Sequence, residues 1–201
     1  MLQDFSGLRS ELSKLLTDAF DAVSEQLAQA QERQQSLRPY LVTRVRRGVV
    51  GGSRYAKRLR QNIREVTQAG GMAKSQKKGR RQPVLIFGEP GLNKDNLAAL
   101  IHFGSVNKSQ PMIQVNCEKL RSQDLFGRGN SQPGLLDWLE TGTLLLNNIQ
   151  DLDEQLKPEI LRLVNTGQYQ PVSREGEAPL PLRDSPAWIL MVAERALPEF
   201  S

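Results

Sequence analysis

The sequence predicts an α/β fold in which a parallel β-sheet lies between helices, preceded by a long amphipathic helix. Over residues 83–201, short apolar runs alternate with helix-forming segments, which is the pattern of a parallel sheet with helical connections. The first of these runs leads into a glycine-rich turn, a lysine and a helix, an order that proteins use to bind phosphate groups. Near the N-terminus, apolar residues recur every three or four positions, which predicts the long helix.

We expect three regions in the 201 residues: an N-terminal helix (1–38), a basic linker with a second helix (39–82) and a phosphate-binding core (83–201). The first helix covers about residues 3–35, and Pro39 closes the segment. Such a helix is usually a packing or dimerising element rather than a chemical one. Its apolar stripe consists of Phe5, Leu8, Leu12, Leu15, Leu16, Phe20, Val23 and Leu27.

The middle region concentrates positive charge. Residues 38–81 contain fourteen Lys and Arg against Glu65 alone, a net charge of +13, whereas the whole chain carries +5. Two interpretations stay open: the segment contacts nucleic acid or another polyanion, or it is a solvated linker and helix face that complements the acidic remainder of the chain. The second is favoured, because neither stacking aromatics nor a base-reading motif accompany the charge. Ser53 is placed to cap a helix that starts in this region.

In the core, four apolar runs predict strands at Val84–Phe87, Met112–Val115, Thr143–Leu146 and Trp188–Val192. The segments between these runs predict helices near residues 94–104, 117–125, 132–140 and 153–166.

The loop after the first strand is the candidate phosphate-binding site. Its backbone N–H groups and the start of the following helix would point at the anion, and Lys94 would add a positive charge. The loop departs from the usual pattern G-x-x-x-x-G-K-[ST], because Asn93 replaces a glycine and Asp95 replaces the Ser or Thr that meets magnesium. The candidate residues are Gly88, Glu89, Pro90, Gly91, Leu92, Asn93, Lys94 and Asp95.

Composition argues against several other classes of protein. Cys117 is the only cysteine and His102 the only histidine, so neither an internal disulfide nor a zinc site is expected, and His102 is expected to pack or cap. The sequence shows no secretory signal and no apolar run close to the roughly 20 residues of a membrane span. We therefore expect a cytoplasmic protein without a membrane segment.

A series of short sequence motifs, in the order that the family has them, resembles the AAA+ domain of bacterial sigma-54 activators, the enhancer-binding proteins. The resemblance covers about residues 50–197 and rests on Val50–Ser53, Gly88–Gly91 with Lys94, Val115–Cys117, Asp124–Gly127 and Thr141–Leu144. It implies a P-loop NTPase-like αβα sandwich in which the first predicted strand lies beside the last. It also implies ATP or ADP as the cofactor, with phosphates over residues 88–95 and the adenine near Val50 and Gly51.

Departures from this family bear on catalysis. The family's Walker B pair, Asp-Glu, is replaced by Asn147 and Asn148, which weakens both magnesium binding and activation of the attacking water. The family's sensor asparagine falls at or near Glu194, and a carboxylate there would face the γ-phosphate.

Other departures are missing parts. The family's GAFTGA loop, which touches the sigma factor, has no counterpart between Phe126-Gly127 and Gly134. Up to Ser201 the sequence also shows none of the family's arginine fingers, last core strand or helical lid. The resemblance therefore implies an AAA+ core of four strands without the lid.

Together these features predict a degenerate AAA+ domain that binds ATP or ADP without efficient hydrolysis. It would act as a regulatory or assembly module, with a protein partner or by self-association. No catalytic residue and no metal ligand is assigned, and little Mg²⁺ binding is expected. Two alternatives remain: a slow ATPase or transcription regulator completed by a neighbouring subunit, and a purely structural interaction module.

Overall fold

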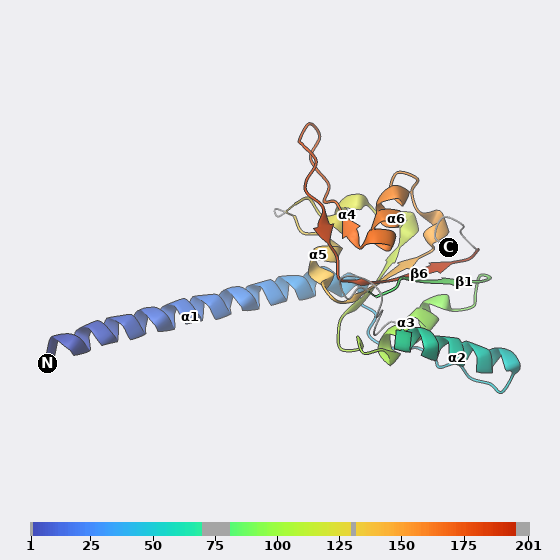
Figure 1. Cartoon of the computed structure of the whole chain (residues 1–201), viewed down its shortest axis with the longest axis horizontal. Coiled ribbons are helices and arrows are strands. Elements are labelled where there is room, and N and C mark those ends of the chain that lie inside the picture. The colour runs from blue at the N-terminus through green and yellow to red at the C-terminus, as the bar shows by residue number, and fades with distance from the viewer. Residues whose placement is uncertain (1, 70–80, 130–131, 196–201) are drawn as a thin grey trace. The chain divides into compact units, whose positions relative to one another are not determined.

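The chain divides into two compact units, Met1–Pro39 and Tyr40–Ser201. The computed structural model describes residues 2–69, 81–129 and 132–195, apart from the side chains of residues 2–6, 8 and 69. The first unit contains one long helix, α1 (Leu2–Leu37), which confirms the predicted N-terminal helix (Figure 1). The stripe residues from Leu12 to Leu27 are exposed, whereas Phe5 and Leu8 lie outside the described side chains.

The second unit is built on a four-stranded parallel sheet in the order β1-β6-β3-β2. As predicted, β1 pairs in parallel with β6, with Val84 opposite Leu190. Because all four strands run the same way, their carboxyl ends meet at one edge, where ligands bind in open α/β folds. The strands are β1 (Val84–Phe87), β2 (Met112–Asn116), β3 (Thr143–Asn147) and β6 (Trp188–Ala193).

Helices cover both faces of this sheet, as Figure 1 shows. One face carries α2 (Arg54–Ala69) and α3 (Lys94–Gly104), and the other carries α4 (Ser122–Phe126), α5 (Leu135–Leu139) and α6 (Lys157–Thr166). The central strands β3 and β6 are consequently buried on both faces, which explains their continuous apolar sequences. On the α3 face, Leu145, Leu190 and Val192 form a buried cluster with Ala98 and Ile101 of α3.

The helix predicted near residues 117–125 is wrong as one element. It consists of a 3₁₀ turn, η2 (Cys117–Lys119), followed by α4 after a break at Leu120, whose backbone is extended. The Asn116 side chain accepts a hydrogen bond from the Glu118 N–H at 3.2 Å. Asparagine used in this way stabilises a local turn in competition with a continuing helix.

The helices predicted near residues 132–140 and 153–166 are shorter than expected. The first is helical only in α5, which ends where Glu140 adopts φ 52. The second begins only at Lys157, and Pro158 in its first turn is pre-organised for a helix start. Local backbone geometry at the ends, which apolar spacing does not reveal, sets these limits.

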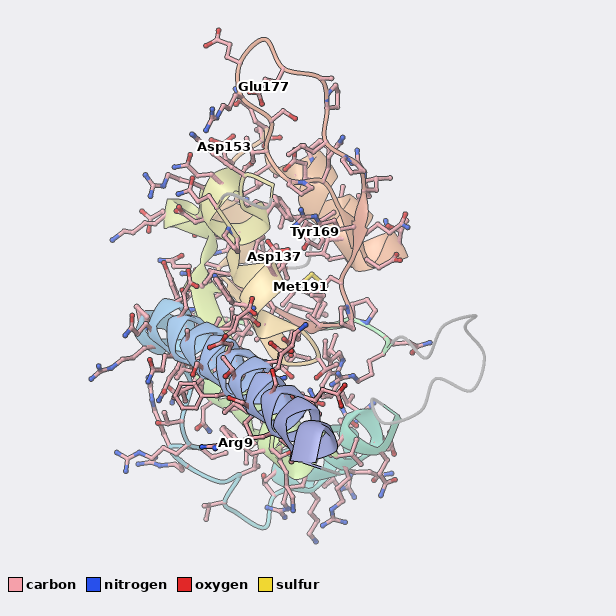
Figure 2. The ribbon with its side chains drawn as sticks, turned by 90° about the vertical axis from the view of Figure 1, so that its left-hand side faces the viewer. Arg9, Asp137, Asp153, Tyr169, Glu177 and Met191 are labelled. Carbon is pink, nitrogen blue, oxygen red and sulfur yellow. The ribbon has the colours of Figure 1, made fainter. Side chains whose placement is uncertain are left out.

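A small antiparallel hairpin, β4 (Gln168–Tyr169) and β5 (Arg183–Asp184), has no counterpart in the sequence prediction. Asp137 of α5 anchors it: the Tyr169 hydroxyl donates to Asp137 Oδ1 at 2.6 Å, and Arg183 Nη1 donates to the same oxygen at 2.9 Å. Figure 2 shows Asp137 and Tyr169 close together. Burial, together with the bond to Asp137, raises the pKa of Tyr169, so its hydroxyl stays protonated as a donor.

The connection between α4 and α5 closes on itself at Gly127 and Gly134. A Cβ atom on either glycine would collide with the backbone of the other, and Gly127 has φ +70, so both positions require glycine. Beyond this neck, the Arg128 N–H donates to Gln132 O at 2.7 Å. The closed neck fits the short connection that the sequence predicts in place of the GAFTGA loop.

His102 is fully buried on α3. Its Nδ1 lies 2.8 Å from Thr143 Oγ1, and the Asn107 side-chain amide donates to the same hydroxyl at 3.3 Å. Burial lowers the pKa of His102 to about 4, an effect that the nearby backbone of Gln110 opposes in part. A neutral histidine packed in the core agrees with the packing role that the sequence predicts for His102.

From the lowered pKa of His102 we predict that the protein loses stability in mild acid. The pKa of a histidine in an unfolded chain is about 6.5, so between pH 6.5 and 4 His102 is protonated in the unfolded state but neutral in the folded state. The contribution is fully present above pH 6.5 and is lost as the pH falls, by roughly 3 kcal/mol in total at pH 4 and below.

Urea unfolding of the wild type and of His102→Gln between pH 7.5 and 4 measures this effect. We expect the variant to lose less free energy of unfolding across that range than the wild type does. Because His102 is the only histidine, its ring protons can also be titrated by NMR without assignment. Parallel stability curves for the two proteins, or a native pKa near 6.5, would contradict the prediction.

Candidate nucleotide-binding site

The phosphate loop, residues 88–93, turns between β1 and α3. Gly91 (φ +81) and Asn93 (φ 48) both adopt the left-handed backbone region. Asparagine tolerates this region better than most residues, so Asn93 takes the conformation without the glycine of the usual pattern. No side chain caps α3 at Asn93, which leaves the first N–H groups of the helix available to an anion.

Lys94 places its positive charge in this loop. Its residue exposure is only 7%, and its Nζ donates to Glu89 O at 2.7 Å. A buried lysine is rare unless its charge has partners, so the loop carbonyl holds the ammonium where a phosphate oxygen could replace it. A methyl group on Gly88 would come within 3.3 Å of the Leu92 side chain, which favours glycine there. The loop therefore fits a phosphate group.

A pocket of about 470 Å³ lies beside the loop, between it and the segment that precedes α2. Gly48, Val49 and Val50 line one side, and Leu92 and Asn93 of the loop line the other. Val50 is 83% exposed and leaves an apolar surface open to a ligand. The structure thus brings Val50 to the loop. Gly51, in contrast, does not line the pocket.

Two side chains that the sequence analysis misses hold this segment in place. Arg60 of α2 donates from Nη1 to Val49 O at 3.0 Å and to Gly51 O at 2.9 Å. Asn96 of α3 accepts from the Arg46 N–H at 2.9 Å and the Arg47 N–H at 3.2 Å, and donates to Arg47 O at 2.6 Å. The second clamp ties the pocket wall directly to the helix that starts at Lys94.

Asp95 pairs with a basic side chain in the structure. Its Oδ2 lies 3.4 Å from Arg46 Nη1, and the arginine side chain is 77% exposed. An exposed ion pair of this kind contributes little energy. Its position matters more, because it joins the residue after the lysine to the wall of the adjacent pocket.

The carboxyl ends of β1, β3 and β6 come together around a second pocket of about 380 Å³. Pro90, Gln150, Asp151, Glu194 and Arg195 line it. The Glu194 N–H donates to Gln150 Oε1 at 3.2 Å, which links the end of β6 to the turn after β3. Glu194 therefore lies near the phosphate loop at Pro90. Asp151 is a carboxylate at this position that the sequence analysis misses.

Asn147 and Asn148 stand at the end of β3 but line neither of these pockets. Asn147 pairs with Asn116 across the sheet, and Asn148 adopts the left-handed region with φ 56. An amide supplies neither a negative charge nor a base at neutral pH. Within the described ranges, no group of three or more His, Cys, Asp or Glu is placed to hold a metal ion.

None of the described helices is both long enough and apolar enough to cross a membrane.

Comparison with known proteins gives sequence relatives that are transcription regulators. The TyrR transcriptional regulatory protein of Haemophilus influenzae is 36% identical over 102 residues, which cover 47% of this chain and 32% of that protein. The transcriptional regulatory protein GlrR of Escherichia coli is 31% identical over 128 residues, which cover 58% of this chain and 28% of that protein. The chain thus spans about a third of the length of these relatives.

Solved structures of NtrX from Brucella abortus share the fold. The complex of NtrX with ADP superposes with a TM-score of 0.59 at 20% identity, covering 89% of this chain and 36% of that chain. The complex with ATP gives the same TM-score at 22% identity and covers 39% of that chain. The family model described as the sigma-54 interaction domain matches residues 56–183, well over half of the sequence. The chain therefore belongs to the sigma-54 activator family and carries its AAA+ domain.

Proposed function

We propose that this chain is a degenerate AAA+ domain that binds ATP or ADP without efficient hydrolysis and serves as a regulatory or assembly module. The observation that carries the proposal is the contrast between the phosphate loop and the end of β3. Lys94 is buried over a phosphate loop that fits a phosphate, whereas the end of β3 offers only the amides of Asn147 and Asn148.

Nucleotide binding would use the residues around the loop. The phosphates would lie over Gly88–Asp95, with Lys94 closest, and the adenine would enter the 470 Å³ pocket beside Val50. The same arrangement supports binding in a second way, because the clamps from Arg60 and Asn96 hold the pocket wall in place without a ligand. The NtrX structures with ADP and ATP support a nucleotide as the ligand of a domain with this fold.

Hydrolysis would lack its usual charges. Magnesium prefers carboxylate and phosphate oxygens, and the attacking water needs a base, but positions 147 and 148 supply neither. Glu194 adds a negative charge at the same edge of the sheet, where developing negative charge on the phosphate needs neutralising. Each of these changes reduces the stabilisation of the transition state for hydrolysis more than it reduces the binding of the nucleotide.

The two alternatives rest on different features. A slow ATPase completed by a neighbouring subunit would need a carboxylate near the phosphates, and Asp151 is the described candidate in the pocket beside Pro90. A structural interaction module would need no nucleotide at all. In either case, regulation would act through a protein partner or through self-association.

For the basic segment, residues 38–81, contact with nucleic acid or another polyanion remains a separate proposal. On α2, Arg54, Lys57, Arg58 and Arg64 are exposed, which supports such a contact. Arg60 and Arg81, by contrast, donate to carbonyl groups of the same chain.

Isothermal titration with ATP and with ADP, with and without Mg²⁺, tests the proposal beside a phosphate-release assay. We expect one nucleotide per chain, an affinity for ADP that changes little when EDTA removes Mg²⁺, and phosphate release near background. The absence of binding to either nucleotide would leave the structural module. Turnover on the order of 1 per second, an ordinary enzyme rate, would refute the proposal.

A further inference from the structure

The long helix α1 presents an apolar surface to solvent. We name it the α1 stripe and define it by Leu12, Leu15, Leu16, Phe20, Val23 and Leu27. These six side chains are between 56% and 72% exposed. Large apolar side chains that are exposed singly are common, but a continuous row of them marks an interaction surface.

The spacing of this stripe fits a partner helix. From Leu12 to Leu27 its members recur at intervals of three and four residues, apart from the adjacent Leu15 and Leu16, so they lie along one side of the helix. The 36 residues of α1 span about 54 Å at 1.5 Å per residue. Most helical stability in proteins comes from packing of such a face, so we expect the stripe to be covered when α1 is stable in solution.

We infer that the α1 stripe pairs with the α1 stripe of a second copy of this chain, with the two helices antiparallel. A self-complementary apolar row needs only its own copy, related by a two-fold axis, to be covered. Six side chains of this size bury roughly 600 Å² per helix, or about 1,200 Å² for the pair, which reaches the lower end of stable protein interfaces. The area therefore lies within the range of specific dimers, at its lower limit.

The charges of α1 favour the antiparallel arrangement. Residues 2–14 carry Asp4, Arg9, Glu11 and Lys14, a net charge of 0, whereas residues 18–37 carry Asp18, Asp21, Glu25, Glu32 and Arg33, a net charge of −3. Parallel helices would place the two acidic segments side by side. Antiparallel helices place each acidic segment beside the neutral N-terminal part of the other, where Figure 2 labels Arg9, and also oppose the two helix dipoles.

Antiparallel pairing also matches the sizes of the side chains. If Leu12 lies opposite Leu27 of the second copy, then Leu16 lies opposite Val23 and the large Phe20 lies opposite the small Ala19. This register has its centre near residues 19 and 20 and matches every member of the stripe with an apolar residue except Leu15, which lies opposite Ser24. A parallel pair in register would instead stack Phe20 on Phe20.

The mass of the full chain in solution tests the dimer. We expect a dimer at micromolar concentration by light scattering, and a monomer for Leu16→Lys/Val23→Lys. The matched control is Ala28→Lys/Gln29→Lys, which adds the same two charges about 120–140° around the helix from Val23 and should stay dimeric. Circular dichroism should show the helix content of the wild type in the control variant and a lower content in Leu16→Lys/Val23→Lys, because α1 loses its packing there. A monomeric wild type, or loss of the dimer in both variants, would overturn the inference.

Disulfide trapping tests the direction of the helices. In a Cys117→Ala background, Leu12→Cys and Leu27→Cys chains are oxidised separately and as an equal mixture. Antiparallel pairing predicts a mixed cross-link between positions 12 and 27 that is much stronger than either self-cross-link. Efficient self-cross-linking at both positions would show parallel helices and refute the antiparallel pair.

Discussion

Replacing Lys94 with alanine is expected to abolish measurable binding of ATP and ADP, with an affinity at least about 100-fold lower than that of the wild type. The ammonium already lies in the phosphate loop, where its Nζ contacts Glu89 O at 2.7 Å. A hydrogen bond from a charged group contributes about 1.5–3 kcal/mol, and Lys94 also supplies the positive charge that the phosphates need in a partly desolvated loop. Isothermal titration of Lys94→Ala against both nucleotides measures the loss.

Two controls make this result specific. Lys108→Ala removes a lysine that is exposed beyond the other end of α3, so it changes the charge of the chain equally but leaves the loop intact. Urea unfolding of both variants shows whether Lys94→Ala remains folded, since its side chain is buried in the native state. Unchanged affinity in a folded Lys94→Ala protein would mean that the nucleotide binds elsewhere.

Restoring the catalytic carboxylates one at a time leaves hydrolysis near background. Loss of a general base costs roughly 10²–10⁴ in rate, and the magnesium ligand and the base act as a unit, so their effects are not additive. The backbone adds a further obstacle, because Asn148 has φ 56 and glutamate tolerates that region less well than asparagine. Asn148→Glu alone therefore gains neither a well-placed base nor a metal.

The double variant Asn147→Asp/Asn148→Glu separates the missing groups. We expect it to gain hydrolysis only when a partner supplies an arginine to neutralise the developing charge. Phosphate release is measured for the wild type, the single variant and the double variant, and nucleotide affinity is measured for each so that weak binding is not mistaken for weak chemistry. Hydrolysis at an ordinary enzyme rate by Asn148→Glu alone would contradict the account.

The sheet could be predicted from the sequence because its central strands are buried on both faces and its edge strand β1 is also apolar. Val84–Phe87 and Trp188–Val192 read as short apolar runs between helical segments, and this pattern leaves few other arrangements. The phosphate loop could be predicted for a similar reason, since its glycines, Asn93 and Lys94 are adjacent in sequence. Contacts within a few residues leave a local signal.

The walls of the candidate site could not be predicted, because the contacts that build them are distant in sequence. Asn96 clamps Arg47 across 49 residues, and neither residue type is unusual for a helix or a loop. The hairpin that Asp137 anchors has strands of two residues each, too short for any periodicity to appear. Asp151 was missed because its approach to Pro90 depends on the relative positions of two strands.

The closed neck at Gly127 and Gly134 has a consequence for the lengths that the connection between α4 and α5 tolerates. Since the two glycine backbones touch, the chain enters and leaves the connection at nearly one point, and its length beyond that point hardly affects the packing of α4 and α5. Doubling the length of such a loop costs only about 0.6 kcal/mol of closure entropy. A segment attached in this way can change in length while the rest of the domain keeps its shape.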